Sequence, residues 1–227
     1  MIVLALCLSP LSKGYVTGYM SPTLEELVAD GLLPSSFAVD FFAAAIYVGS
    51  ALSCFVSGWY ADRFGRRGAL MASAVPLFGG WVLIAGQWGC ASLLVGRLLN
   101  GFGSAVVFTT FGIYVAETVA ASRRGGWTVL GEASMSVGAL LALGLGQSLD
   151  ARWLASVSAA AAVAVFVAVS RVPETPRYYL EHNRIDDARR SLEWIRGGPA
   201  DAEFAFLKAQ LDDRPSHKVT ADCIVDN

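Results

Sequence analysis

The residues of this chain that could do chemistry are charged side chains at the ends of long apolar stretches. The string GWYADRFGRR (58–67) sets one aspartate among arginines, and further acids and arginines follow at later stretch ends. Opposite charges of this kind can interlock in one conformation and separate in another, which makes a two-state element. An exposed pair contributes only about 0–1 kcal/mol, yet several together can bias a conformational equilibrium. The candidates for this charged gate are Asp62, Arg63, Arg66, Arg67, Glu117, Arg124, Glu174 and Arg177.

A second group of candidates lies inside the apolar stretches, where an ionisable residue is costly and indicates function. Lys13 and Glu132 carry opposite charges, and we expect both to face one central cavity. They either pair directly or are solvated independently in a wet cavity. Thr17 adds a hydroxyl one helical turn beyond Lys13, and Met135 follows Glu132 on a face that serves packing more often than contact. The candidate functional residues inside the apolar stretches are Lys13, Thr17, Glu132 and Met135.

The elements that must position these residues are apolar helices. The chain has 227 residues, of which 55% are hydrophobic and 16% charged, and apolar stretches occupy most of 1–170. Such stretches have no polar face, which excludes a soluble globular protein, a disulfide scaffold and a disordered chain. A helix needs about 20 apolar residues to cross a bilayer. The sequence therefore predicts an all-α membrane protein with six transmembrane helices, near 1–22, 37–60, 69–87, 90–116, 126–148 and 152–171.

The orientation of the six spans follows from the positions of lysine and arginine. Basic residues crowd the loops after the second and fourth spans and the polar segment after the sixth, whereas the opposite side has only Arg152. Both termini are therefore expected in the cytoplasm, and the charged gate at the cytoplasmic ends. Arg97 precedes Glu117 by 20 residues, roughly 30 Å along a helix. It either snorkels to the outer interface or serves packing or gating.

The polar end of the chain shows two short helical patterns. An apolar stripe of Ile185, Ala188, Leu192 and Ile195 predicts one helix, with Asn183 as its N-cap and Gly197-Gly198-Pro199 as its stop. A second helix is expected at about 201–212. The predicted organisation is a transmembrane bundle at 1–172, a cytoplasmic helical segment at 173–211 and a disordered tail at 212–227.

Other kinds of function find no support in the sequence. The net charge of −2 gives no nucleic-acid footprint. Both histidines lie in the polar end, and the four cysteines are scattered, so neither a metal site nor a disulfide pattern is expected. No cluster of nucleophile, base or metal ligands occurs within the spans, so we expect no enzyme and no cofactor.

Four motifs in consistent order resemble those of the sugar porter family of the major facilitator superfamily. The resemblance runs from about Gly14 to Gly197. The motifs are G-x-x-x-D-R-x-G-R-R at 58–67, G-R-x-x-x-G-x-G at 96–103, Y-x-x-E at 114–117 followed by Arg124-Gly125, and P-E-T-P-R at 173–177.

This resemblance implies one six-helix half of a plasma-membrane carrier that moves a sugar by alternating access, most similar to glucose and trehalose facilitators. The gate is then expected to stabilise the outward-facing state. Lys13 stands where the family usually has an aromatic residue that faces the sugar cavity, and Glu132 where many members have a glutamine that hydrogen-bonds the sugar. The resemblance therefore implies a substrate-binding role for Lys13, Thr17, Glu132 and Met135. Val16 replaces the aspartate of proton-coupled porters, which favours facilitated diffusion (uniport), while Glu132 leaves proton coupling open. The expected partners are a sugar, the lipid bilayer and a missing C-terminal half or another transporter chain.

Several alternatives stay open at this point. The chain is a fragment, a shortened isoform, or a half that associates with another chain. An organic-ion facilitator of the same superfamily shares two of the motifs, but it usually carries a large domain where this chain has only residues 23–36. A regulatory half that does not itself transport is the remaining possibility.

Overall fold

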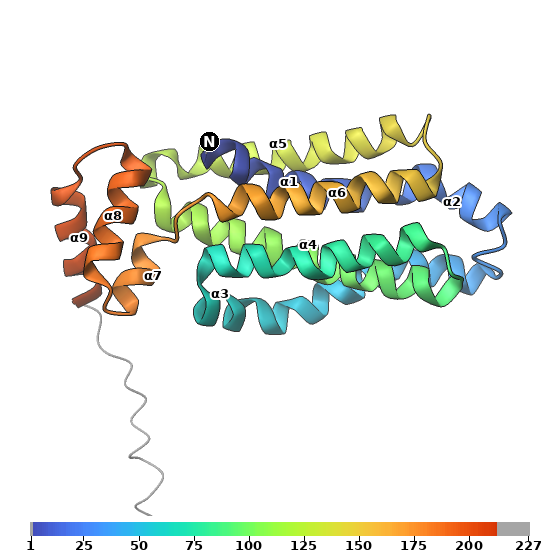
Figure 1. Cartoon of the computed structure of the whole chain (residues 1–227), viewed down its shortest axis with the longest axis horizontal. Coiled ribbons are helices and arrows are strands. Elements are labelled where there is room, and N and C mark those ends of the chain that lie inside the picture. Colours follow the sequence, from blue (N-terminus) through green and yellow to red (C-terminus); the bar gives the residue numbers. More distant parts are fainter. Residues whose placement is uncertain (1, 213–227) are drawn as a thin grey trace, which may run out of the picture. The chain divides into compact units, whose positions relative to one another are not determined.

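The chain is helical throughout the part that the computed structural model describes, residues 2–212, with side chains at 7–120 and 122–209 (Figure 1). This confirms the predicted all-helical class. The chain divides into two compact units, one up to Thr175 and one from Pro176 on. The tail predicted at 212–227 lies outside the described residues, apart from Asp212 at a helix end. The helices are α1 (Ile2–Gly18), α2 (Met20–Ala29), α3 (Ser36–Gly86), α4 (Cys90–Thr118), α5 (Ala121–Leu145), α6 (Ala151–Ser170), α7 (Pro176–Glu181), α8 (Ile185–Arg196) and α9 (Asp201–Asp212).

Four helices in the described part are long and apolar enough to cross a membrane, namely α3, α4, α5 from Ser122 on, and α6. Helix α3 covers both of the spans predicted at 37–60 and 69–87. Its 51 residues are interrupted at Gly65, whose backbone has φ 80° and ψ 168°. A positive φ is easy only for glycine, so two helices meet at this residue with no separate loop between them.

The first predicted span differs from the structure at its end. Helix α1 stops at Gly18, and after Tyr19 the chain continues as α2, so most of the connection expected at 23–36 is helical. Two contacts hold α2 to the start of α6. The Tyr19 hydroxyl donates to the carbonyl oxygen of Ala151 at 2.9 Å, and the backbone N–H of Ala151 donates to Glu26 Oε2 at 2.7 Å.

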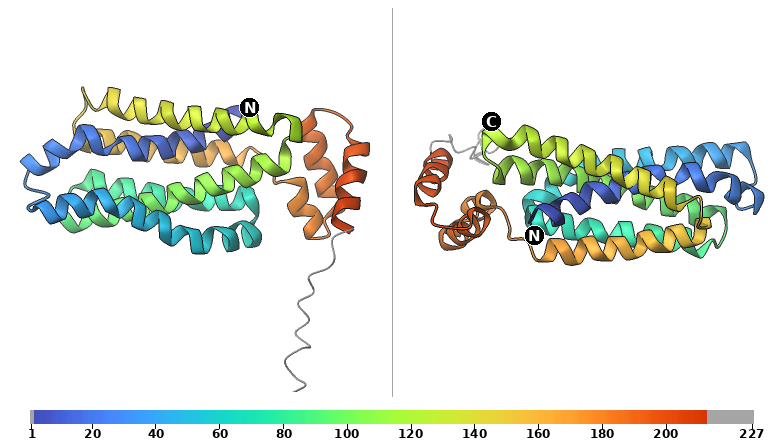
Figure 2. Two further views of the ribbon diagram at one scale, coloured as in Figure 1. Left: turned by 180° about the vertical axis from the view of Figure 1, so that it is seen from behind. Right: turned by 90° about the horizontal axis from the view of Figure 1, so that it is seen from above.

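Close backbone approach between helices shapes the first unit. Helices α1 and α5 lie side by side (Figure 2). A Cβ atom added at Gly138 would lie 2.0 Å from the carbonyl oxygen of Leu11, and one added at Gly14 would lie 1.8 Å from that of Met135. Small residues at such contacts let the backbones pack directly, the usual solution in membrane helices.

The second unit contains α7, α8 and α9. Asn183 is not the N-cap of α8, contrary to the sequence prediction, because it adopts a left-handed conformation with φ 57° just after α7. Arg184 holds the N-cap position instead. Of the apolar stripe, Ala188 and Leu192 are buried and Ile195 is half-buried, whereas Ile185 is exposed. Helices α8 and α9 are joined by ion pairs, of which Arg196–Glu203 has an Nε–Oε2 distance of 2.7 Å.

The α1–α5 contact predicts unequal effects of two glycine substitutions on α5. Gly138→Ala places a methyl group against the backbone of α1 and is expected to lower the free energy of unfolding by about 1–3 kcal/mol. Gly144→Ala is the matched control, since nothing lies within 4 Å of its added Cβ. Thermal unfolding in detergent measures both. Equal melting temperatures for the two variants would contradict the packing.

Candidate functional site

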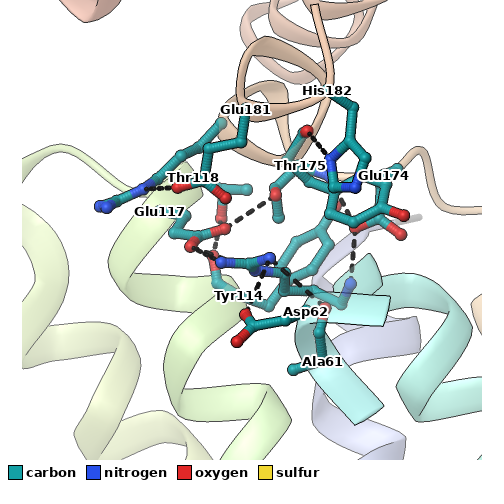
Figure 3. Close-up of polar contacts among 12 residues, drawn as sticks. Ala61, Asp62, Tyr114, Glu117, Thr118, Glu174, Thr175, Glu181 and His182 are labelled. Carbon is teal, nitrogen blue, oxygen red and sulfur yellow. Dashed lines mark hydrogen bonds and ion pairs between the residues drawn. The ribbon is translucent and has the colours of Figure 1, made fainter. Parts of the chain in front are cut away.

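The predicted gate contains a buried ion pair between α3 and α4. Arg66 donates from Nε and Nη2 to Glu117 Oε1, at 3.1 and 2.8 Å. The two side chains are only 8% and 6% exposed. The other carboxylate oxygen, Glu117 Oε2, accepts a hydrogen bond from Thr175 Oγ1 at 2.8 Å (Figure 3). Both oxygens of Glu117 are therefore bonded, as a buried carboxylate requires.

Glu174 caps a helix start that lies more than 100 residues earlier in the chain. Because Gly65 interrupts α3, the backbone N–H groups that follow it begin a new helix and lack intrahelical acceptors. Glu174 Oε1 accepts the N–H of Arg66 at 2.9 Å, and Oε2 accepts that of Arg67 at 3.0 Å. Burial raises the pKa of Glu174, opposed in part by backbone N–H donors from Thr175, Arg67, Arg66 and Gly68.

The segment that carries Glu174 is positioned by α4 and by the end of α6. The Tyr114 hydroxyl donates to the carbonyl oxygen of Pro173 at 2.9 Å, and Arg67 Nη2 donates to that of Ser170 at 2.6 Å. Tyr114 is 1% exposed within an apolar cluster. Sequence reasoning assigned no role to Tyr114 or Thr175. Their places inside the Y-x-x-E and P-E-T-P-R motifs were the signal available.

We call Arg66, Arg67, Glu117, Glu174 and Thr175 the helix-end cluster, since their contacts within the first unit join the helix start after Gly65 in α3 to the ends of α4 and α6.

The other predicted gate residues lie in different surroundings. Asp62 is 79% exposed, and its Oδ1 lies 3.8 Å from Arg66 Nη1. Arg63 is also exposed. Arg124 is exposed, and its Nε donates to the carbonyl oxygen of Val119 at 3.0 Å, so it caps the end of α4. Arg177 belongs to the second unit and pairs with Glu181.

The predicted substrate residues lie on α1 and α5. The Lys13 ammonium lies 3.6 Å from the centroid of the Phe108 ring, and Glu132 acts on it electrostatically. The described side chains of Lys13 and Glu132 form no ion pair, so the direct bond considered from the sequence is not made. Thr17 and Glu132 are exposed, whereas Met135 is half-buried, with its backbone against Gly14.

Arg97 does not snorkel to an interface, because it is 1% exposed in the core. Its Nη1 donates to the carbonyl oxygen of Val16 at 2.8 Å, in the last turn of α1. The guanidinium carbon lies 4.8 Å from the Phe42 ring and 5.7 Å from the Tyr19 ring. A helix C-terminus and two ring faces all carry partial negative charge, which stabilises this buried cation.

The burial of the Arg66–Glu117 pair predicts a large effect of removing one partner. Arg66→Met is expected to lower the free energy of unfolding by about 3 kcal/mol, because it leaves a carboxylate in the interior without its cation. Arg123→Met is the control, since Arg123 is exposed and is expected to change stability by less than about 0.5 kcal/mol. Thermal unfolding in detergent compares them. Similar losses in both variants would contradict a buried pair.

The raised pKa of Glu174 predicts a pH dependence with a definite sign. The folded chain holds this proton more tightly than the unfolded chain, in which the pKa is near 4.5. The stability that Glu174 contributes is therefore greatest below pH 4.5 and falls as the pH rises through the folded pKa. Glu174→Gln removes the titrating carboxyl group. The change in the helix cap alters the free energy of unfolding of this variant by the same amount at every pH, so it does not affect the pH dependence.

We expect the melting temperature of the wild type, relative to Glu174→Gln, to decline as the pH rises from 4.5. Glu25→Gln, at an exposed position on α2, should follow the wild type at every pH. A wild type that gains stability over Glu174→Gln with rising pH would show that the pKa is lowered.

Comparison with known proteins gives consistent results. A family model described as "Sugar (and other) transporter" matches residues 1–225. The chain is 32% identical to "Sugar transporter ERD6-like 6" of Arabidopsis thaliana, over 88% of this chain and 41% of that protein. It is also 32% identical to "Facilitated trehalose transporter Tret1" of Drosophila virilis, over 92% of this chain and 24% of that protein. The chain thus spans less than half the length of these relatives.

The fold is similar to solved structures of a bacterial transporter. A partially occluded inward-open structure of the xylose transporter XylE from E. coli superposes with a TM-score of 0.83 at 22% identity, covering 93% of this chain and 58% of that one. XylE bound to 6-bromo-6-deoxy-D-glucose, described as a proton:xylose symporter of the major facilitator superfamily, gives 0.84 at 23% identity, covering 93% and 52%. These relatives are transporters and not enzymes. The chain belongs to the family described as "Sugar (and other) transporter", as its four motifs predict.

Proposed function

We propose that this chain is one six-helix half of a carrier that moves a hexose or a trehalose-like sugar across a membrane by alternating access. The observation that carries the proposal is the helix-end cluster, in which two arginines and two acids join the break in α3 to the ends of α4 and α6. The family membership and the trehalose transporters among the relatives support a sugar as substrate.

The proposed topology has six crossings. The four apolar helices supply five of them, because α3 contributes one on each side of Gly65, and α1 supplies the sixth. The distribution of lysine and arginine supports cytoplasmic termini, and we propose the plasma membrane as the location. Residues 1–172 then form the bundle, 173–211 a cytoplasmic helical segment and 212–227 a tail.

The helix-end cluster is proposed to act as a gate on the cytoplasmic side, together with Asp62, Arg63, Arg124 and Arg177. In the outward-facing state its charges are interlocked, and in the inward-facing state they separate. Because Arg66 and Glu117 are buried, separating them exposes two charges that must be hydrated. This difference between states is what lets a charge network bias an alternating-access equilibrium.

The proposed substrate face comprises Lys13, Thr17, Glu132 and Met135, of which Thr17 and Glu132 are open to solvent in this half. We propose uniport, because Val16 stands where proton-coupled porters carry an aspartate, and a valine side chain cannot bind a proton. The contact of Val16 with Arg97 uses the backbone, since the Val16 carbonyl oxygen accepts a hydrogen bond from Arg97. Two halves related by an axis along the membrane normal enclose the substrate in this superfamily. The proposed partner is therefore a second six-helix half, on a longer product of the same gene or on another chain.

Counterflow of labelled glucose and trehalose in proteoliposomes tests this proposal. We expect no counterflow by the purified chain alone and measurable counterflow after co-reconstitution with the C-terminal half of a trehalose transporter. A protonophore should leave the rate unchanged, and Glu132→Ala, which removes the hydrogen-bonding group, should lower it about fivefold, the value of roughly one hydrogen bond. Glu25→Ala, at an exposed position on α2, is the matched control.

The outcomes separate the alternatives. Counterflow by the chain alone would contradict the need for a second half. Loss of transport with the protonophore would replace uniport by proton coupling. A chain that gives no counterflow with any second half, but slows a full-length relative, would be a regulatory half.

A further inference from the structure

An aromatic ring on α4 is covered by a lysine side chain from α1. The Nζ atom of Lys13 lies 3.6 Å from the centroid of the Phe108 ring, well within the range of a cation–π contact. Both residues are half-buried. The contact therefore lies at a surface and not in the core.

The surroundings of Phe108 are open and polar, unlike those of the next phenylalanine on the same helix. Phe111 is 5% exposed and packs against Gly131 of α5. Near Phe108, by contrast, Thr109 and Gly112 are exposed, and a Cβ added at Gly112 would meet nothing within 4 Å. Phe108 thus lies on a more open part of α4 than Phe111 does.

The Lys13 ammonium has two possible partners. The ring of Phe108 holds it in this structure, while the exposed carboxylate of Glu132 attracts it electrostatically without forming an ion pair. A long flexible lysine stem can exchange one such partner for the other. Movement toward Glu132 would replace the cation–π contact by an ion pair and leave the ring face uncovered.

We propose that Phe108 is the aromatic platform for a sugar ring and that Lys13 is its lid, displaced toward Glu132 when the sugar binds. This inference rests on the proposed sugar transport. The C–H groups on one face of a pyranose ring are apolar and carry slight positive charge, so they suit the negative face of an aromatic ring. The ammonium competes for the same face, and its new contact with Glu132 offsets the contact that it loses.

The proposed lid also restricts the class of substrate that can bind. A ligand must present a flat C–H face to replace the ammonium, which a pyranose does and an acyclic polyol does not. Glucose and trehalose should therefore displace Lys13, whereas sorbitol, which has hydroxyl groups like those of glucose but no ring, should not.

Nuclear magnetic resonance on the detergent-solubilised chain with ¹³C-labelled lysine tests the lid directly. The chain has only three lysines, Lys13, Lys208 and Lys218, so the spectrum is simple, and Lys13→Arg identifies the signal. The methylene next to Nζ of Lys13 should be shifted upfield by the Phe108 ring current. Phe108→Leu should abolish that shift and Phe108→Tyr should retain it, whereas Phe102→Leu, elsewhere on α4, should leave it unchanged.

Addition of glucose or trehalose should move the Lys13 signal to its unshielded position, and sorbitol should not. Phe108→Leu should weaken glucose binding about threefold to tenfold, as expected for the loss of one ring contact. Phe108→Tyr should bind normally. If Phe108→Leu fails to fold, the sugar titrations of the wild type and of Phe108→Tyr still decide the question.

Two results would overturn the lid while sugar transport stands. One is a Lys13 signal equal in the wild type and Phe108→Leu, and the other is glucose binding that leaves a shielded Lys13 in place. If no sugar binds and no counterflow occurs with a second half, the proposed function fails and the lid fails with it. The two failures are distinguished by counterflow, which is absent when the proposed function fails and is still present when only the lid fails.

Discussion

The interaction on which this helical bundle depends is the satisfaction of helix ends by charged side chains from distant parts of the chain. Helices that pack in an apolar medium leave N–H groups at one end and carbonyl oxygens at the other, and lipid offers them no partner. Here a carboxylate from a distant part of the chain accepts hydrogen bonds from the backbone N–H groups at each of two helix starts. A guanidinium group from a distant part of the chain donates to a carbonyl oxygen near each of three helix ends. The pairs are Glu174 with Arg66 and Arg67, Glu26 with Ala151, Arg67 with Ser170, Arg152 with Ala85, and Arg97 with Val16.

The sequence predicts the features that depend on local composition. Apolar length fixes the long helices, and the glycine requirement at Gly65 was visible in the motif. The end of α1 at Gly18 could not be predicted from the sequence, because the apolar run continues past it. The contacts that hold α2 involve Ala151, which lies far away in the sequence. The αL conformation of Asn183 was missed for a similar reason, since asparagine suits both an N-cap and a left-handed turn.

The candidate site shows the same limit. The motifs name Arg66, Glu117 and Glu174, but they do not say that the backbone of Arg66 serves one acid while its side chain serves the other. The opposite charges of Lys13 and Glu132 suggested mutual contact, yet the ring of Phe108 takes the ammonium instead. Partners that lie far apart in sequence are set by packing, and one sequence without the fold does not reveal them.

The cap on Arg66 and Arg67 has a mechanical consequence. The second part of α3 and the short segment 173–175 are joined by several hydrogen bonds at one point, and Tyr114 ties that segment to α4. A hinge motion between α6 and the rest of the bundle would have to break the hydrogen bonds that Glu174 and Pro173 accept. The separation of gate charges proposed for the inward-facing state therefore has to break these hydrogen bonds together, so that the change between the two states is all-or-none at this point.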